Sequence, residues 1–83
     1  MRNILITGGA GGLGRAAACR LADAGCRVFS GDIREQEAYP NVIPVLLNLR
    51  DPESIAAAFE RIAGMITSLD AVIHLAGVYM MDS

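Results

Sequence analysis

The sequence predicts an α/β fold, in which a parallel sheet of about four strands lies between helices in three layers. Short apolar runs of β type alternate with stretches of helical periodicity, which is the pattern of strands joined by crossover helices. A glycine-rich segment, residues 7–14, lies between the first apolar run and the first helical stretch. With 83 residues, the chain is expected to form one domain at most.

The first three elements are predicted as a strand, a helix and a second strand. The first strand spans roughly residues 3–7, the helix about residues 12–24 and the second strand roughly residues 27–32. Gly25 is suited to the position just after a helix end, where a left-handed backbone is common. Four apolar residues are expected to share one face of this helix: Leu13, Ala17, Leu21 and Ala24.

The connection from the second strand to the third, at residues 42–47, is short. Only about nine residues lie between the two strands, whereas a parallel crossover usually takes a dozen or more. We therefore expect a loop or a single helical turn here. Pro44 cannot donate a backbone hydrogen bond, so the third strand is predicted at an edge of the sheet.

The last two predicted elements are a helix and a fourth strand. Asp51 is expected to cap the helix, and Pro52 suits its first position. The fourth strand is predicted at residues 71–75. Four apolar side chains recur at the spacing of one buried helix face: Ile55, Phe59, Ile62 and Ile66.

Composition and charge argue against several classes of partner. The formal net charge is −2, and the basic residues are seven scattered arginines, so nucleic-acid binding is not expected. No apolar run approaches the ~20 residues of a membrane span, so a cytoplasmic location without membrane contact is expected. Cys19, Cys26 and His74 lie in unrelated segments, and no metal site is predicted. Because 53% of the residues are hydrophobic, we expect exposed apolar surface and self-association.

The segment from Thr7 to Gly14 predicts a cradle for phosphate. Its glycines allow the backbone to approach a pyrophosphate, and the following helix directs its unpaired N–H groups at the anion. Asp32 closes the second strand, where a carboxylate can accept hydrogen bonds from both adenosine ribose hydroxyls and repel the 2′-phosphate of NADP. The pattern therefore favours a Rossmann-type fold that binds NAD.

Four segments together resemble the short-chain dehydrogenases/reductases. The segment from Thr7 to Gly14 resembles the cofactor loop of that family, and Asp32 its NAD-selecting acid. Asn48-Leu49-Arg50-Asp51 resembles the segment that contacts adenine, and residues 69–77 resemble the fourth-strand segment that usually ends Asn-Asn-Ala-Gly. The resemblance covers the whole chain and implies strand order 3-2-1-4, with residues 1–83 as a single partial dinucleotide-binding domain.

Carried over residue by residue, the resemblance implies a set of cofactor contacts. They are Thr7, Gly8, Gly11, Gly12, Leu13, Gly14, Asp32, Ile33, Asn48, Leu49, Ala76 and Gly77. Asn48 replaces an aspartate of the family, but its side-chain oxygen can still accept from the adenine amino group while the Leu49 N–H donates to the ring. His74 and Leu75 replace two asparagines, so the sheet hydrogen bonds of those asparagines are not carried over, and a structural role for His74 is favoured.

Members of the family transfer hydride between nicotinamide and a carbonyl or alcohol, using a tyrosine and a lysine four residues later. This chain contains no lysine, so neither Tyr39 nor Tyr79 belongs to such a pair, and no catalytic residue is predicted. The resemblance thus implies the N-terminal, NAD-binding half of an oxidoreductase. The chain alone is expected to be inactive, with a small-molecule substrate only in a complete protein.

Two alternatives stay open. Because Gly11 and Gly12 are both glycine, the loop also satisfies Thr-Gly-x-x-Gly-x-x-Gly, the spacing of the extended, sugar-nucleotide-modifying subfamily (epimerases and dehydratases). Residues 74–77 resemble that subfamily, whereas residues 13–16 resemble the ordinary one, which we favour. The second alternative is a non-catalytic module that holds a nucleotide and uses its exposed sheet edge for assembly.

Overall fold

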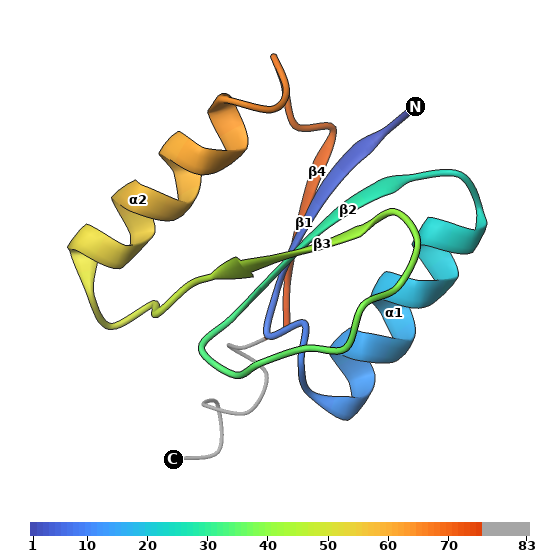
Figure 1. The fold of residues 1–83 in the computed structure, drawn as a ribbon, viewed down its shortest axis with the longest axis horizontal. Helices are drawn as coiled ribbons and strands as arrows, with labels where there is room; N and C mark the ends of the chain where they lie inside the picture. The colour runs from blue at the N-terminus through green and yellow to red at the C-terminus, as the bar shows by residue number, and fades with distance from the viewer. Residues whose placement is uncertain (76–83) are drawn as a thin grey trace.

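The computed structural model describes residues 1–75, which form a parallel sheet with one helix on each face (Figure 1). The elements in chain order are β1 (Asn3–Thr7), α1 (Gly12–Asp23), β2 (Arg27–Asp32), β3 (Val42–Leu46), α2 (Pro52–Ala63) and β4 (Ala71–His74). All paired strands are parallel, in the order β3-β2-β1-β4. The predicted three-layer α/β fold and its strand order are confirmed.

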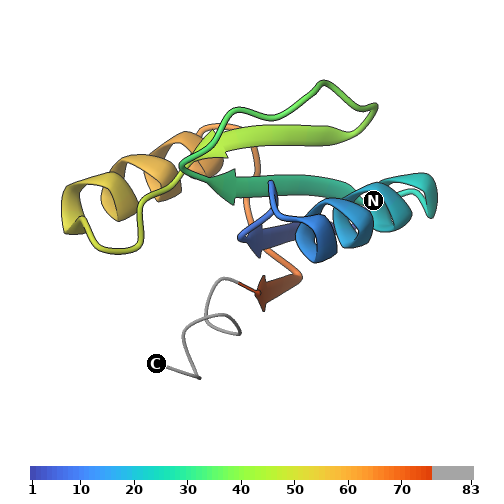
Figure 2. The same cartoon turned by 90° about the horizontal axis from the view of Figure 1, so that it is seen from below.

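Alternation along β1 divides the core into two clusters, one on each face of the sheet. Ile4 and Ile6 pack with buried alanines of α1, whereas Leu5 lies on the opposite face with Phe29 and residues of α2. Figure 2 shows the two helices on opposite faces of the sheet. Burial on both faces explains why the buried residues of β1 and β2 follow one another without alternating with exposed ones.

Helix α1 packs on the sheet through its smallest residues. Gly14, Ala18 and Ala22 are buried, whereas Leu13 is 56% exposed and Ala24 lies beyond the helix and is also exposed. The predicted face was therefore wrong at Leu13 and Ala24, although Ala17 and Leu21 do pack against the core. Small residues four positions apart bring the helix backbone close to the sheet, so size determined the contact face more than hydrophobicity did.

The end of α1 agrees with the prediction at Gly25. This glycine has a φ of 96°, and its N–H donates to the Ala22 carbonyl across 3.0 Å. The Cys26 N–H donates to the Leu21 carbonyl, also across 3.0 Å. These two bonds form a Schellman motif, which satisfies helix carbonyls that would otherwise lack partners.

Residues 33–41 connect β2 to β3 without a helix, as the short spacing predicted. β3 is an edge strand, which confirms the expectation from Pro44. The Pro44 carbonyl accepts a hydrogen bond from Arg61 Nη1 of α2 across 3.0 Å. Proline and this arginine together occupy part of the outer edge of β3.

Helix α2 begins as predicted and differs at one position of its buried face. Asp51 caps it by accepting from the Glu53 N–H across 3.0 Å. Ala58 and Ile62 are buried, while Phe59 is 44% exposed, so the prediction was wrong at Phe59. Each helical residue is turned by about 100° from the last, and Ala58 takes the central position that places Phe59 toward solvent.

β4 forms the other edge of the described sheet, and its residues Ala71 and Val72 are exposed. Ala76 and Gly77 lie outside the described residues, so their predicted cofactor contacts stay predictions. No helix within residues 1–75 combines the length and apolar character that crossing a bilayer requires.

Candidate functional site

The carboxyl ends of β1, β2 and β3 open into one groove with a volume of about 600 Å³. In parallel α/β sheets, ligands bind outside the carboxyl ends of the strands. The groove therefore lies where a nucleotide is expected. Its lining comes from the residues that end or directly follow the three strands: Thr7, Gly8, Gly31, Asp32, Ile33, Arg34, Leu47, Asn48, Leu49 and Arg50.

The glycine loop is attached to the end of β2 by backbone hydrogen bonds. The N–H groups of Gly8 and Gly9 both donate to the Gly31 carbonyl, across 2.8 and 3.1 Å. Gly8 has a φ of 81°, which side chains disfavour, so the turn needs glycine at this position. The loop consequently begins at a fixed place beside β2.

Gly12 and Gly14 have different surroundings. A Cβ added to Gly14 would lie 2.1 Å from the Gly8 carbonyl oxygen, whereas one added to Gly12 meets no atom within 4 Å. Gly14 therefore permits close packing of helix on loop, and Gly12 leaves open space at the start of α1. Gly11, the N-cap of α1, provides no side-chain hydrogen bond, and no acidic residue lies in the first turn. An anion can approach the helix N-terminus there.

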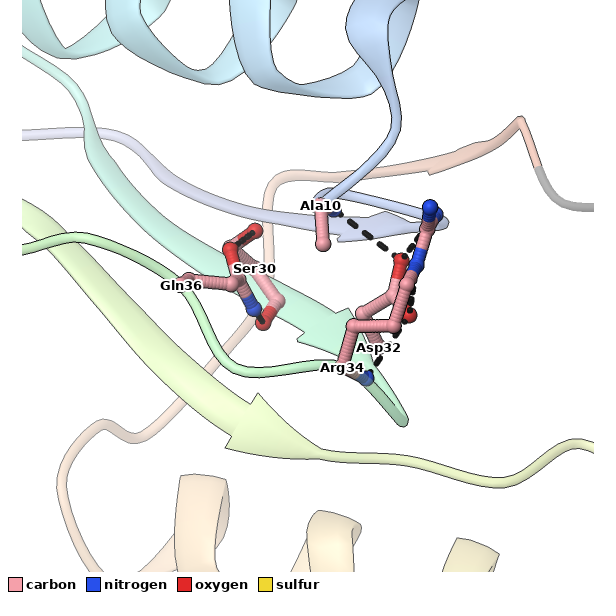
Figure 3. Close-up of polar contacts among 5 residues, drawn as sticks. All are labelled: Ala10, Ser30, Asp32, Arg34 and Gln36. Atoms are coloured by element: carbon pink, nitrogen blue, oxygen red, sulfur yellow. Dashed lines mark hydrogen bonds and ion pairs between the residues drawn. The ribbon is translucent and has the colours of Figure 1, made fainter.

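Asp32 is only 8% exposed, and its carboxylate joins three segments of the chain (Figure 3). Its Oδ2 accepts from the Ala10 N–H across 3.0 Å and from Arg34 Nη2 across 3.2 Å. Its Oδ1 accepts from the Arg34 N–H across 3.1 Å and from Arg34 Nε across 3.2 Å. The acid thus links the glycine loop to the connection that follows β2.

Two opposing effects act on the pKa of Asp32. Burial works to raise this pKa, but the hydrogen bonds from Arg34 and Ala10, with the charge of Arg34, outweigh it and hold the pKa below its ordinary value. The side chain is therefore a carboxylate at neutral pH. A group that must accept hydrogen bonds from ribose hydroxyls needs this charged form.

A second polar contact fixes the connection after β2 and was missed from the sequence. Ser30 is fully buried, and its Oγ donates to Gln36 Oε1 across 2.5 Å while Gln36 Nε2 donates to the Ser30 carbonyl across 2.8 Å (Figure 3). A Cβ on Gly9 would lie 1.9 Å from the Ser30 hydroxyl oxygen. A polar residue inside the buried β2 run is the sequence signal that could have indicated this contact.

Asn48 and Leu49 line the groove, on the side formed by β3. The Asn48 Oδ1 accepts from the Arg50 N–H across 3.0 Å, and the Asn48 N–H donates to Ser54 Oγ across 2.9 Å. The Asn48 oxygen that is expected to accept from adenine therefore already accepts one hydrogen bond within the turn at residues 48–50. Its second lone pair is the one that adenine would use.

His74 has a partner that its sequence neighbours did not indicate. Its Nδ1 lies 2.6 Å from the Oγ1 of Thr7, a residue that is almost fully buried. The contact joins the carboxyl ends of β1 and β4, which are neighbours in the sheet. The structural role that the sequence favours for His74 stays a prediction, which this link between two strands supports.

The predicted site residues separate into two neighbouring groups. Six line the groove: Thr7, Gly8, Asp32, Ile33, Asn48 and Leu49. Gly11, Gly12, Leu13 and Gly14 form the end of the loop and the first turn of α1. Arg34 and Arg50 also line the groove and were not predicted. Among residues 1–75, no group of three or more metal-binding side chains occurs.

Comparisons with known proteins agree with this arrangement. The family model described as short chain dehydrogenase matches residues 2–83. A 3-oxoacyl-acyl-carrier-protein reductase of Thermotoga maritima is 31% identical, over 89% of this chain and 34% of the reductase. A short chain dehydrogenase/reductase of Colletotrichum higginsianum is also 31% identical, over 93% of this chain and 32% of its own length. The chain thus spans about a third of the length of these curated relatives.

Two solved structures illustrate the similarity in three dimensions. A mutant uronate dehydrogenase of Agrobacterium tumefaciens, complexed with NAD, is 33% identical with a TM-score of 0.67, over 90% of this chain and 26% of that one. The ligand-free aldohexose dehydrogenase of Thermoplasma acidophilum has a TM-score of 0.78 and 24% identity, over 88% of this chain and 28% of that one. The second comparison supports the fold.

Proposed function

Since this chain belongs to the short-chain dehydrogenase/reductase family, we propose that it is the NAD(H)-binding half of an oxidoreductase. In a complete protein, the reaction would transfer hydride between the nicotinamide and a carbonyl or alcohol of a small-molecule substrate. Residues 1–83 are then a single partial dinucleotide-binding domain.

One observation carries this proposal: the glycine loop, the end of β2 and the segment after β3 meet at one groove. The open space at Gly12 and the N-terminus of α1 would receive the pyrophosphate. Asp32 would accept hydrogen bonds from the adenosine ribose, and the Asn48 and Leu49 segment would contact adenine. The twelve residues named from the sequence are the proposed cofactor contacts, Ala76 and Gly77 included.

Within the nicotinamide cofactors that the family uses, we favour NAD over NADP. The carboxylate of Asp32 is charged and buried, so a 2′-phosphate placed against it would be repelled. The related uronate dehydrogenase mutant, complexed with NAD, supports the same choice.

The proposal gives residues 1–83 no part in the proton transfer that accompanies hydride transfer. Hydride transfer in the family needs a tyrosine with a lysine four residues later, and this chain has no lysine. His74 is held by Thr7 and has no catalytic role in the proposal. The chain by itself is expected to bind cofactor without turnover.

Calorimetric titration of the 83-residue chain with NAD and with NADP tests the proposal. We expect NAD to bind and NADP to bind more weakly. Binding of neither cofactor by a chain that shows a cooperative unfolding transition would overturn the proposal. Tighter binding of NADP than of NAD would overturn the choice of cofactor alone.

Three further expectations belong to this proposal. Ala71 and Val72 are exposed on the β4 edge, which supports self-association of the chain. A non-catalytic module would use the same edge for assembly with another polypeptide. Residues 74–77 resemble the extended, sugar-nucleotide-modifying subfamily, so a fragment of such an enzyme is the second candidate function. The free thiols of Cys19 and Cys26 support a reducing, cytoplasmic location.

A further inference from the structure

Ser30 is a polar residue in the middle of the buried strand β2. Its exposed fraction is 0%, as are those of the apolar residues Val28 and Phe29 before it. A buried hydroxyl is costly without a hydrogen-bond partner, and here the partner comes from outside the sheet. Gln36 Oε1 accepts from the Ser30 hydroxyl across 2.5 Å, and Gln36 Nε2 donates to the Ser30 carbonyl across 2.8 Å. Both ends of the glutamine amide thus bind one residue of β2.

Gln36 brings the connection after β2 back onto the sheet. That connection, residues 33–41, contains no helix that could pack against the sheet, so side-chain contacts hold it in place. The chain leaves the sheet at the end of β2 and is fixed again at Gln36, its fourth residue after the strand (Figure 3). The stretch between these two points, residues 33–35, is called the rim below. Ile33 and Arg34 of the rim line the groove, so Gln36 helps to determine where this wall of the groove lies.

The glycine loop packs on the same serine. A Cβ added to Gly9 would lie 1.9 Å from Ser30 Oγ and 3.2 Å from Ser30 Cα, so the two residues are in direct contact. Gly9 is itself buried, and its N–H donates to the carbonyl of Gly31, the residue after Ser30. Because the Ser30 hydroxyl donates to Gln36, the serine side chain keeps one orientation against the loop. Ser30 therefore contacts both the glycine loop and the residue that fixes the rim.

The Ser30–Gln36 pair lies outside the groove. Neither residue is among those that line it, so a nucleotide bound there would leave the hydrogen bonds of the pair in place. Asp32 also joins the loop to the connection, but it lines the groove, where the ligand is expected. A link that the ligand does not use can hold the two segments before and after binding. Segments that are already held in place lose less entropy when a ligand binds.

We propose that Gln36, acting through Ser30, is a positioning residue that holds the glycine loop and the rim at the spacing that a dinucleotide needs. The inference rests on the proposed function and adds to it a residue that touches no ligand. The loop would hold the pyrophosphate, and the rim would lie beside the adenosine. The relative position of these two segments then determines whether both parts of the cofactor bind at once. Without the pair, both segments are freer to move, and binding weakens.

Calorimetric titration with NAD and urea unfolding of the 83-residue chain test this role in wild type, Gln36→Met and the double variant Ser30→Ala/Gln36→Met. Methionine is as long as glutamine, but it makes no such hydrogen bonds and takes no fixed orientation. Gln36→Met should lose stability, because the Ser30 hydroxyl is left without a partner, and should bind NAD about ten-fold more weakly. The double variant should regain stability, because removal of both polar groups is nearly neutral, and should keep the weakened binding.

The double variant separates positioning from stability. Recovery of NAD affinity together with stability in the double variant would show that the pair is only structural and would overturn the proposal. Unchanged NAD affinity in folded Gln36→Met would overturn it as well. Amide hydrogen exchange is the second measurement, at the N–H groups of Gly9 and Arg34, which donate to the Gly31 carbonyl and to Asp32 Oδ1. Exchange at both should be about ten-fold faster in the double variant than in wild type, and equal rates would contradict the proposal.

Tyr39→Phe is the matched control, because it removes one hydrogen bond from the far end of the same connection. Tyr39 Oη donates to Asp23 Oδ1 across 2.7 Å, and neither residue lines the groove. We expect the NAD affinity of this variant to stay within about two-fold of wild type. A loss equal to that of Gln36→Met would mean that every anchor of the connection has the same effect, which would refute the particular role of Gln36.

Failure of the proposed function is recognised separately, by titration of wild type with NAD and ADP. If wild type binds neither nucleotide, the proposed function fails and this inference fails with it. If wild type binds NAD and Gln36→Met binds it equally well, the proposed function stands and only the role of Gln36 is refuted.

Discussion

Ala10 and Asp32 are joined by a hydrogen bond of 3.0 Å from the backbone N–H of the first residue to Oδ2 of the second. The residues are 22 positions apart in the sequence. One belongs to the glycine loop and the other ends β2. The acid expected to hold the ribose therefore also holds the loop expected to hold the pyrophosphate, so the two parts of the site form one unit.

Replacement of Asp32 by asparagine is expected to lower the free energy of unfolding at pH 7 by about 1 kcal/mol, because hydrogen bonds to a charged acceptor are lost. The pKa of Asp32 in the folded chain lies below its ordinary value of 3.8. The stabilisation is thus present above pH ~3.8 and is lost as the pH falls through the lower folded-state pKa. Urea unfolding of both chains at pH 7 and near pH 3 measures this. A difference of the same size at both pH values would contradict it.

Gly12→Leu and Gly14→Ala should separate ligand approach from packing. The open space at Gly12 accepts a side chain, so Gly12→Leu should unfold at the wild-type temperature yet bind NAD about ten-fold more weakly, because the side chain occupies the place of the phosphate. Gly14→Ala should lose about 2 kcal/mol or more of stability, because its Cβ meets the Gly8 carbonyl. Thermal denaturation and calorimetry check both. Undiminished NAD affinity in folded Gly12→Leu would show that the loop is only a turn.

Removal of the cap of α2 by Asp51→Ala is expected to cost about 1 kcal/mol of unfolding free energy, because the Glu53 N–H loses its acceptor. Asp51→Asn is the matched control, since asparagine also caps helices well and should retain most of the stability. Urea unfolding of the three chains provides the comparison. Equal losses in both variants would mean that the charge near the helix N-terminus matters more than the hydrogen bond.

The contact between Thr7 Oγ1 and His74 Nδ1 should appear as a coupling energy. We expect the stability losses of Thr7→Val and His74→Phe to be non-additive by about 1 kcal/mol, because both variants remove the same part-buried hydrogen bond. A double-mutant cycle of urea unfolding measures the coupling. Additive losses would show that the hydrogen bond contributes no net stability.

Self-association through the β4 edge should be abolished by Val72→Lys. Val72 is exposed on an edge strand, where a lysine opposes pairing with another chain. Leu46→Lys is the matched control on the β3 edge, which already contains Pro44 and the hydrogen bond from Arg61. Sedimentation velocity over a range of concentrations should show association in wild type and Leu46→Lys only. Association that persists in Val72→Lys would assign it to another surface.

Local features of the sequence were sufficient for the order and type of the elements, and the predicted ends of α1, β3 and β4 each differ from the observed ones by one residue. Gly25 ends α1 and Asp51 begins α2, because caps depend on a few adjacent residues. Pro44 indicated an edge strand, because a residue without an N–H cannot complete a central ladder. The helix faces were less predictable. Leu13 and Phe59 are exposed, because the small residues Gly14 and Ala58 take the adjacent buried positions.

Residue patterns alone predict that a glycine loop, an acid after the second strand and a third segment meet at one edge of a parallel sheet, because strand periodicity and parallel connection fix that edge. The groups around the acid follow from tertiary packing: the N–H of Ala10, the guanidinium of Arg34 and the hydrogen-bonded pair of Ser30 and Gln36. It also gave His74 its partner across the sheet. Those contacts depend on where backbones and side-chain ends come to lie after packing, which residue spacing does not specify.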